Sequence, residues 1–333
     1  MTIVDIAKES GYSVSTVSRV LNGRRDVSPA ARTKIMEIVE ARHFVPNNNA
    51  KHLKQTVSMS ILILVKGTSN MLFANIIEAV QTTVEDSEYS IRVHYLDEDA
   101  NEVSEAIKVC REHKPMGILF LGGNEKYFRE QFDQVKVPCV LVTNRGDELG
   151  FANLSSVAID DTAAAEDAVD YLFAQGHTNI AVIGGDLQVS STSIQRQKGC
   201  LNSFKKHGRE FDEQYYSKAR FAYDSAYRAM DRLLDRKLPI TAVFAMSDVM
   251  AIGAIRAIHD RGLKVPDDIS MIGFDGSLLA DYYSPKIVTV RQDSEEMAVR
   301  SVEILLSMID LNHQAIHELI PFELKNLESV IAR

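Results

Sequence analysis

The chain has 333 residues, of which 45% are hydrophobic and 25% charged, and its formal net charge is −9. This length predicts about two or three domains with ample hydrophobic cores. No apolar run approaches the roughly 18 residues of a membrane span, and the N-terminus lacks a signal peptide's basic start and apolar core, so we expect a cytoplasmic protein without membrane contact.

Charge is divided unevenly along the chain. Residues 1–57 hold nine Lys and Arg against five Asp and Glu, a net charge of +4, which leaves −13 for the remainder. A basic segment can meet phosphates, whereas an acidic body is repelled by them. This division is typical of a small nucleic-acid-binding domain attached to a larger domain that has another function.

The N-terminal segment predicts three short helices. A first helix leads into a Gly-Tyr-Ser turn, and Ser13 is a good N-cap for a second helix in which Val17, Val20 and Leu21 form an apolar stripe. A Ser-Pro pair then suits the start of a third helix at Pro29. Helix, short turn and helix make the helix-turn-helix unit, whose second helix enters the major groove of DNA.

Residues 2–47 contain the pattern T-I-V-D-I-A-K-E-S-G-Y-S-V-S-T-V-S-R-V-L-N-G, followed by V-S-P-A-A-R and F-V-P-N. The pattern resembles the DNA-binding headpiece of the LacI–GalR family of bacterial repressors. The resemblance implies a headpiece over residues 1–46 and a homodimer that reads a two-fold symmetric operator in double-stranded DNA. The headpiece residues that would contact DNA are Val14, Ser15, Thr16, Ser18, Arg19 and Asn22.

Residues 47–58 follow Pro46 and include three consecutive asparagines, so free in solution they are interpreted as a flexible linker. In the family, the matching segment is a hinge helix that forms on operator DNA and inserts a leucine into the minor groove. The resemblance assigns the wedge to Leu53, with Ala50 and Lys51 beside it. Lys51 replaces the usual arginine and lacks its planar fork.

From residue 59 onward, apolar runs that suit buried strands alternate with amphipathic helices. The predicted strands of a first sheet lie at about 60–65, 91–95, 117–121 and 139–142, with helices at about 72–86, 102–112 and 126–132. A second sheet is expected to begin at 157–159 and to continue at 180–183, 215–219, 242–245 and 270–272, with helices at about 162–174, 194–207, 225–235 and 249–261. A strand at 287–290 and a helix at 295–308 suggest a return to the first sheet.

The fold class that follows is a small all-α headpiece joined to an α/β core, residues 59–333, of two doubly wound parallel-sheet lobes. The core resembles periplasmic binding proteins, and this resemblance places the chain crossings. The N-lobe would cover about 59–157 and 289–320, and the C-lobe about 158–288 and 321–333.

The core carries further stretches that resemble the family, among them R-x-x-G at 196–199, V-P-D-D-I-S at 265–270, G-F-D at 273–275 and T-V-R-Q at 289–292. The resemblance therefore covers essentially the whole chain. Only four residues follow Ser329, which leaves no heptad segment to build a tetramer, so a dimer is expected.

The sequence contains no G-x-S-x-G, G-x-x-x-x-G-K-[ST], G-x-G-x-x-G or H-E-x-x-H motif, and its histidines and cysteines lack metal-ligand spacing. We therefore predict no enzymatic activity, no cofactor and no metal. The acidic pairs at 160–161 and 267–268 are interpreted as helix caps and His177 as a structural hydrogen-bonding residue. The three cysteines are interpreted as free thiols.

In doubly wound sheets a ligand binds beyond the C-terminal ends of the strands. The resemblance supplies a set of effector-binding candidates, which are Phe73, Asn144, Arg196, Phe221, Ser247 and Asp275. A guanidinium fork and a carboxylate suit the hydroxyls of a sugar, and the phenyl rings suit its apolar face. We predict a sequence-specific repressor whose operator affinity changes when a small ligand, a carbohydrate, binds between the lobes.

Alternatives stay open at this point. A co-repressor-dependent or global regulator of the same family would respond to a purine or to a phosphoprotein partner. A solute-binding protein of a transporter would need a signal peptide and no headpiece, and an enzyme on the same scaffold would need a catalytic constellation. The effector, the operator sequence and the direction of the response do not follow from the sequence.

Overall fold

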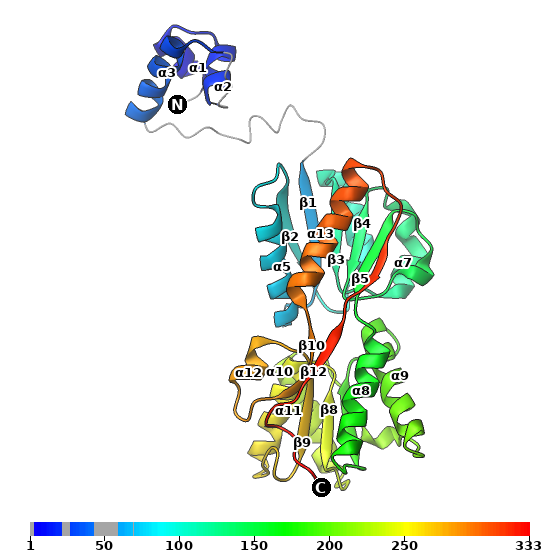
Figure 1. Ribbon diagram of the computed structural model, residues 1–333. Coiled ribbons are helices and arrows are strands. Elements are labelled where there is room, and N and C mark those ends of the chain that lie inside the picture. Colours follow the sequence, from blue (N-terminus) through cyan, green and yellow to red (C-terminus); the bar gives the residue numbers. More distant parts are fainter. Residues whose placement is uncertain (1–2, 22–26, 43–58, 69) are drawn as a thin grey trace. The chain divides into compact units, whose positions relative to one another are not determined.

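The computed structural model describes residues 3–21, 27–42, 59–68 and 70–333. The chain divides into two compact units, Met1–Ser58 and Met59–Arg333 (Figure 1). The predicted hinge at 47–58, with Ala50, Lys51 and Leu53, lies outside the described residues, and so does Asn22. The roles assigned to these residues stay predictions.

The N-terminal unit contains the helices α1 (Ile3–Ser10), α2 (Val14–Leu21) and α3 (Pro29–Ala41). A small shared core holds them together, and its buried members are Ile6, Ala7, Val17, Val20 and Ile35. The hydroxyl of Ser13 accepts a hydrogen bond from the N–H of Thr16 at 3.2 Å, as an N-cap does. Ser28 caps α3 in the same way through the N–H of Ala31. The predicted helix-turn-helix fold is confirmed.

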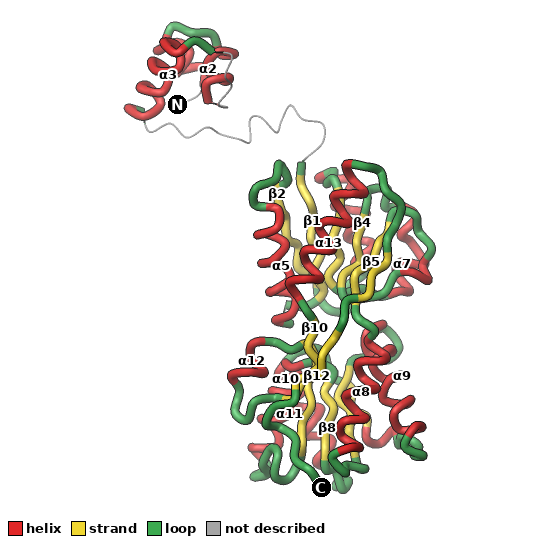
Figure 2. Tube along the Cα trace, in the orientation of Figure 1, coloured by secondary structure: helices red, strands yellow, loops and turns green. Residues whose placement is uncertain are grey.

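The first lobe of the core is a six-stranded parallel sheet in the order β11-β5-β4-β3-β1-β2 (Figures 1 and 2). Its strands are β1 (Ser60–Lys66), β2 (Ser90–Leu96), β3 (Gly117–Leu121), β4 (Cys139–Val142), β5 (Leu154–Ala158) and β11 (His317–Leu319). Four helices cover its two faces, α5 (Met71–Val84) with α13 (Ser294–Asp310), and α6 (Glu102–His113) with α7 (Glu125–Gln131).

β1 shows why both faces of this sheet are covered. Its residues Ile61, Ile63 and Val65 pack into the cluster that contains α5 and α13. Leu62 and Leu64, which alternate with them, pack into the cluster of α6 and α7. Successive side chains of a strand point to opposite faces, so a continuous apolar run demands cover on both sides.

The second lobe is a six-stranded sheet in the order β12-β10-β9-β8-β6-β7, in which β12 runs antiparallel to β10. Its strands are β6 (Ile180–Gly184), β7 (Tyr216–Lys218), β8 (Ala242–Ala245), β9 (Ser270–Asp275), β10 (Val288–Gln292) and β12 (Phe322–Lys325). The helices are α8 (Asp161–Ala174), α9 (Ser191–Lys206), α10 (Tyr223–Asp235), α11 (Asp248–Asp260) and the short α12 (Leu278–Tyr282).

Two helix pairs flank the second sheet, α8 with α9 and α10 with α11 (Figure 1). A glycine permits the close approach within each pair. A Cβ on Gly199 would lie 2.2 Å from the carbonyl oxygen of Thr162, and one on Gly253 would lie 2.2 Å from that of Tyr223. Glycine is therefore required at both contacts.

Two strands were predicted to lie in the wrong sheet. The strand near 157–159 was expected to open the second sheet, but β5 pairs with β4 and β11 in the first. The strand at 287–290 was expected to return to the first sheet, but β10 pairs with β9 and β12 in the second. A buried strand is apolar whichever sheet it joins, so its pattern does not identify its neighbours. The helix that follows, α13, does pack on the first lobe against α5.

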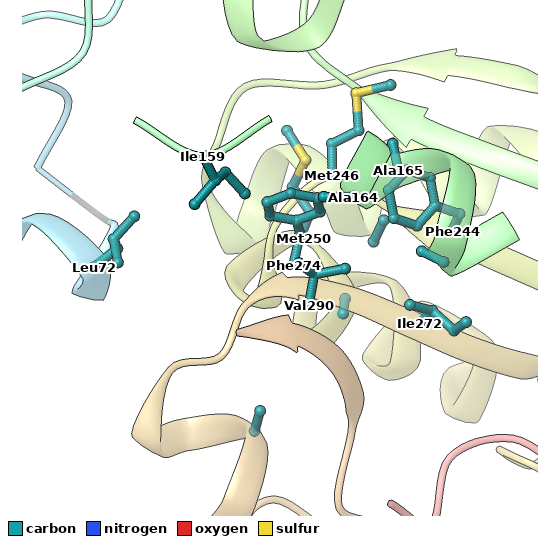
Figure 3. Packing of buried hydrophobic residues seen from close by; sticks show 14 of the residues in the cluster. Leu72, Ile159, Ala164, Ala165, Phe244, Met246, Met250, Ile272, Phe274 and Val290 are labelled. Carbon is teal, nitrogen blue, oxygen red and sulfur yellow. The ribbon is translucent and has the colours of Figure 1, made fainter. Parts of the chain in front are cut away.

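The chain thus passes between the lobes after β5, between β10 and α13, and between β11 and β12. Buried side chains continue across these passages. Leu72 of the first lobe and Ile159 in the first passage belong to the same cluster as Phe244, Phe274 and Val290 of the second lobe (Figure 3). This shared packing makes the two lobes one structural unit.

His177 is structural, as predicted. It is fully buried, with Nδ1 3.0 Å from the hydroxyl of Thr241 and Nε2 3.0 Å from the carbonyl oxygen of Ile331. These bonds tie the C-terminal segment to the second lobe. The three cysteines, Cys110, Cys139 and Cys200, are free thiols. In the described ranges, no helix is both long and apolar enough to cross a membrane.

Candidate functional site

The surface of α2 fits the role predicted for a DNA-reading helix. Val17 and Val20 are buried in the headpiece core, whereas Val14, Ser15 and Arg19 are exposed on the outside of the helix. Thr16 and Ser18, also predicted to contact DNA, are half-buried. The exposed side thus offers short side chains and one guanidinium, which is the chemistry that reads base edges in the major groove.

A second candidate site is a cavity of about 500 Å³ between the lobes of the core. Its walls come from the C-terminal ends of strands in both sheets, the position where doubly wound folds bind ligands. The N-lobe contributes polar and aromatic side chains, including Lys66, Asn70, Phe73, Glu98, Asn124 and Tyr127. The C-lobe contributes Asp186, Ser190, Thr192, Arg196, Lys218, Arg220, Phe221, Asp275 and Gln292.

Arg196 organises the C-lobe wall. Its Nε lies 2.8 Å from Oδ1 of Asp161, and its Nη1 donates to the carbonyl oxygen of Met246. The guanidinium stacks on the ring of Phe274 at 3.5 Å from the centroid. Stacking and hydrogen bonds together hold the planar group in one orientation, so that it meets a ligand without first losing rotational freedom.

Asp275 sits beside this guanidinium at the end of β9. Its Oδ1 lies 3.9 Å from Nη1 of Arg196 and accepts a hydrogen bond from Nε2 of Gln292 at 2.9 Å. The backbone φ of Asp275 is 113°, a conformation that costs a non-glycine residue free energy and that tends to occur at functional sites. Burial raises the pKa of this carboxyl to about 8, although Arg196 and the Gln292 hydrogen bond both act to lower it.

A buried acceptor faces this cluster without a partner in the described part of the chain. It is Oε1 of Gln292, whose Nε2 is held by Asp275. An unpaired buried carbonyl costs about 1–3 kcal/mol. Gln292 is one of the residues that line the cavity, so a ligand hydroxyl that reached this oxygen would remove that cost.

The N-lobe wall holds another buried ion pair. Nζ of Lys66 lies 2.8 Å from Oε2 of Glu102, and the other carboxylate oxygen accepts a hydrogen bond from the backbone N–H of Asn124. The ammonium also lies 5.4 Å from the centre of the Tyr127 ring. These contacts fix Lys66, Asn124 and Tyr127 at the cavity surface.

Several polar contacts cross from lobe to lobe around the cavity. Asn144 Nδ2 donates to the hydroxyl of Thr192 at 3.0 Å, and the N–H of Glu125 donates to the hydroxyl of Ser191 at 3.1 Å. The N–H of Phe221 donates to Glu98 at 3.1 Å. The structure therefore holds the lobes in a closed arrangement.

The structure places four of the predicted effector residues on the cavity wall: Phe73, Arg196, Phe221 and Asp275. Asn144 and Ser247 do not line it. Asn144 is turned toward Thr192 in the interlobe contact, and Ser247 is fully buried as the N-cap of α11, where its hydroxyl accepts from the N–H of Met250. Both follow a strand's C-terminal end, yet capping and interlobe bonding use their side chains.

Sequence reasoning missed several wall residues. Gln292 ends a stretch already noted for its resemblance, and its place at a strand's C-terminal end was a usable signal. Asp161 was interpreted as a cap, but Asp160 caps α8 while Asp161 is buried against Arg196. The pairing of Lys66 with Glu102 could not be predicted from the sequence, because the two residues lie 36 positions apart.

A helix-turn-helix unit on the same chain as a two-lobed core with an interlobe cavity defines a DNA-binding regulator with a ligand-binding core. Residues 2–47 match the family of bacterial regulatory proteins of the lacI type, and residues 169–330 match the periplasmic binding protein-like domain. The chain belongs to the LacI family of bacterial transcriptional regulators.

Similarity to curated relatives extends over nearly the full length. The chain is 36% identical over 334 residues to the HTH-type transcriptional regulator MalR of Clostridium butyricum, and the match covers 99% of each chain. It is 30% identical to catabolite control protein A of Priestia megaterium, covering 92% of this chain and 91% of that protein. These relatives are regulators of transcription, so the chain is a regulator and not an enzyme.

Solved structures agree with this assignment. A complex of the transcriptional regulator CelR with cellobiose superposes with a TM-score of 0.71 at 26% identity, covering 99% of each chain. The lac repressor dimer bound to operator and the anti-inducer ONPF has a TM-score of 0.84 at 23% identity, covering 100% of this chain and 99% of that one. The predicted fold class is confirmed by these likenesses.

Proposed function

We propose that this protein is a repressor that binds a two-fold symmetric operator as a homodimer and responds to a carbohydrate in the core cavity. The observation that carries the proposal is one cavity that combines Arg196, Asp275 and Gln292 with the rings of Phe73 and Phe221. A sugar presents hydroxyls to such polar groups and C–H faces to such rings. The CelR–cellobiose complex supports this ligand class. Because the proposed operator is bacterial DNA, we propose that the protein acts in the cytoplasm.

We also propose a direction for the response, in which the ligand weakens operator binding. A ligand that touches both lobes favours one lobe orientation, and it shifts the protein only as far as its affinities for the two states differ. The hinge at 47–58 directly precedes β1 in the sequence, so a change of lobe orientation in a dimer would alter the spacing of the two hinges. We propose that Leu53 then leaves the minor groove and DNA is released, with a coupling of roughly 1–3 kcal/mol.

The test begins with a thermal-shift screen of mono- and disaccharides, nucleobases and sugar phosphates. Each hit then enters an operator titration with wild type, Asp275→Asn and Asp260→Asn. Asp275→Asn should bind operator normally and need about tenfold more sugar for release, because an amide group replaces one of the two carboxyl oxygens that can bond to sugar hydroxyls. Asp260→Asn changes an exposed carboxylate on α11, paired with Arg256 at 2.7 Å, and should respond like wild type.

Two results would contradict the proposal. If Asp275→Asn released operator DNA at the same sugar concentration as wild type, the effector would bind somewhere other than this cavity. A nucleobase that strengthens operator binding, with no sugar active, would make the protein a co-repressor-dependent regulator.

A further inference from the structure

We infer that the cavity selects an uncharged sugar and rejects its phosphorylated or carboxylated counterparts. The inference rests on the proposed carbohydrate effector and narrows it to a chemical subclass. Its basis is the charge arrangement of the wall. Lysine and arginine side chains line the cavity, but each of them in the described part of the chain already has a carboxylate partner.

The two deep cations are neutralised by buried carboxylates. Lys66 is paired with Glu102 at 2.8 Å and Arg196 with Asp161 at 2.8 Å. The side chains of Glu102 and Asp161 are 0% and 8% exposed, so neither carboxylate can turn to water if an incoming anion takes its cation. Removing one partner from a buried pair is strongly unfavourable because a charge is left without compensation.

The two rim cations are also paired. Lys218 lies 2.9 Å from Asp186, and Arg220 lies 2.7 Å from Asp97. Glu98 and Asp99 lie beside Arg220 on the cavity wall, at 3.6 and 3.5 Å from its guanidinium nitrogens. An anionic ligand at the rim would therefore lie close to several carboxylates, while both cations there are already paired.

Backbone N–H groups at helix starts are the other common means of binding a phosphate. Four helices begin at this cavity, and three of them have a side-chain cap that accepts from such an N–H. Asn70 accepts from Leu72 at 2.9 Å, Asn124 from Lys126 at 3.0 Å, and Ser190 from Ser193 at 3.3 Å. The start of the fourth helix, α10, has no side-chain cap, but Asp224 lies in its first turn and Glu98 accepts from the neighbouring N–H of Phe221, so an anion there would meet carboxylates. The features left for a ligand are hydroxyl and amide groups, those of Gln292 included, and two phenyl rings.

The experiment compares matched neutral and anionic probes by isothermal titration calorimetry on the full chain. The pairs are cellobiose with cellobiose 6′-phosphate, maltose with maltose 6′-phosphate, and glucose with glucose 6-phosphate and glucuronate. In whichever pair binds, the neutral member should bind about tenfold or more tightly than its anionic counterpart. An anionic member that binds as tightly or more tightly overturns the inference and leaves the sugar effector intact. Absence of binding by every member would overturn the carbohydrate effector and the inference together.

A variant tests the cause of the selectivity. Asp186→Asn releases Lys218 at the rim and should shift the ratio of anionic to neutral affinity toward the anion by about three- to fivefold, as expected for one exposed charge. Asp260→Asn releases an equally exposed cation, Arg256, outside the cavity and should leave the ratio unchanged. An unchanged ratio in Asp186→Asn would show that ion pairing does not set the selectivity, and would overturn the inference.

Discussion

Nη2 of Arg220 lies 2.7 Å from Oδ1 of Asp97, and this ion pair joins the two lobes of the core. Arg220 follows β7 of the C-lobe, and Asp97 follows β2 of the N-lobe. The neighbouring N–H of Phe221 donates to Glu98 across the same gap. One short segment of each lobe therefore forms a polar latch at the cavity edge, which we define as Asp97–Asp99 with Arg220–Phe221.

The latch should stabilise the closed arrangement, and Arg220→Gln should weaken it. We expect the effector affinity to fall a few-fold and the radius of gyration of the ligand-free protein to rise, because the ion pairs that join the lobes are lost. The pairs are exposed, so salt should produce a similar change in wild type. Calorimetry and small-angle X-ray scattering at low and high salt measure both effects. Arg256→Gln, which breaks an exposed pair within α11, is the control. Equal behaviour of the two variants would show that the latch does not stabilise the closed arrangement of the lobes.

Arg196 should matter for stability as well as for ligand binding. Arg196→Ala leaves the buried carboxylate of Asp161 without its partner, and we expect the free energy of unfolding to fall by about 3–5 kcal/mol. The double variant Asp161→Asn/Arg196→Met removes both charges and should recover part of that loss. Urea denaturation followed by circular dichroism compares them. If the single and double variants are equally unstable, unpaired charge is not the cause.

Stability should depend on pH through Asp275. Burial raises its pKa to about 8 from an ordinary 3.8, so the folded protein holds this proton more tightly than the unfolded chain does. The corresponding stability is therefore present at low pH and is lost as pH rises toward about 8. Asp248, whose pKa burial raises to about 6, contributes in the lower part of this range.

Between about pH 6 and 8, Asp275 should dominate the difference between wild type and Asp275→Asn. We expect the wild-type free energy of unfolding to fall relative to the variant by no more than about 1.4 kcal/mol per pH unit. Urea denaturation at half-unit pH steps measures this difference. A difference that is constant over the range would mean that Asp275 does not titrate there.

Arg19 should carry sequence specificity in the headpiece. An arginine that contacts a guanine discriminates by roughly 1–3 kcal/mol, so Arg19→Ala should lose operator specificity and keep effector binding. Footprinting and calorimetry on the same preparation separate these activities. Protection of the same base pairs by the variant would show that Arg19 does not read the operator.

The headpiece could be predicted from sequence because its determinants are local. Ser13 caps the short helix that holds Val17 and Val20, and helical spacing alone separates its buried face from its exposed face. The strands of the core were also recognisable, since a buried parallel strand is a continuous apolar run. Membership of a sheet is a long-range property, and this is why β5 and β10 were assigned to the wrong sheets.

The cavity wall shows the same division. Its location followed from the sequence, because ligands bind beyond strand C-termini in doubly wound folds. Which side chains face the cavity was decided by tertiary contacts. Ser247 caps a helix, whereas Gln292 lines the cavity and has a buried Oε1 without a partner in the described part of the chain. The pairing of Lys66 with Glu102, and of Arg220 with Asp97, depends on separate elements meeting in space, and only the folded chain determines it.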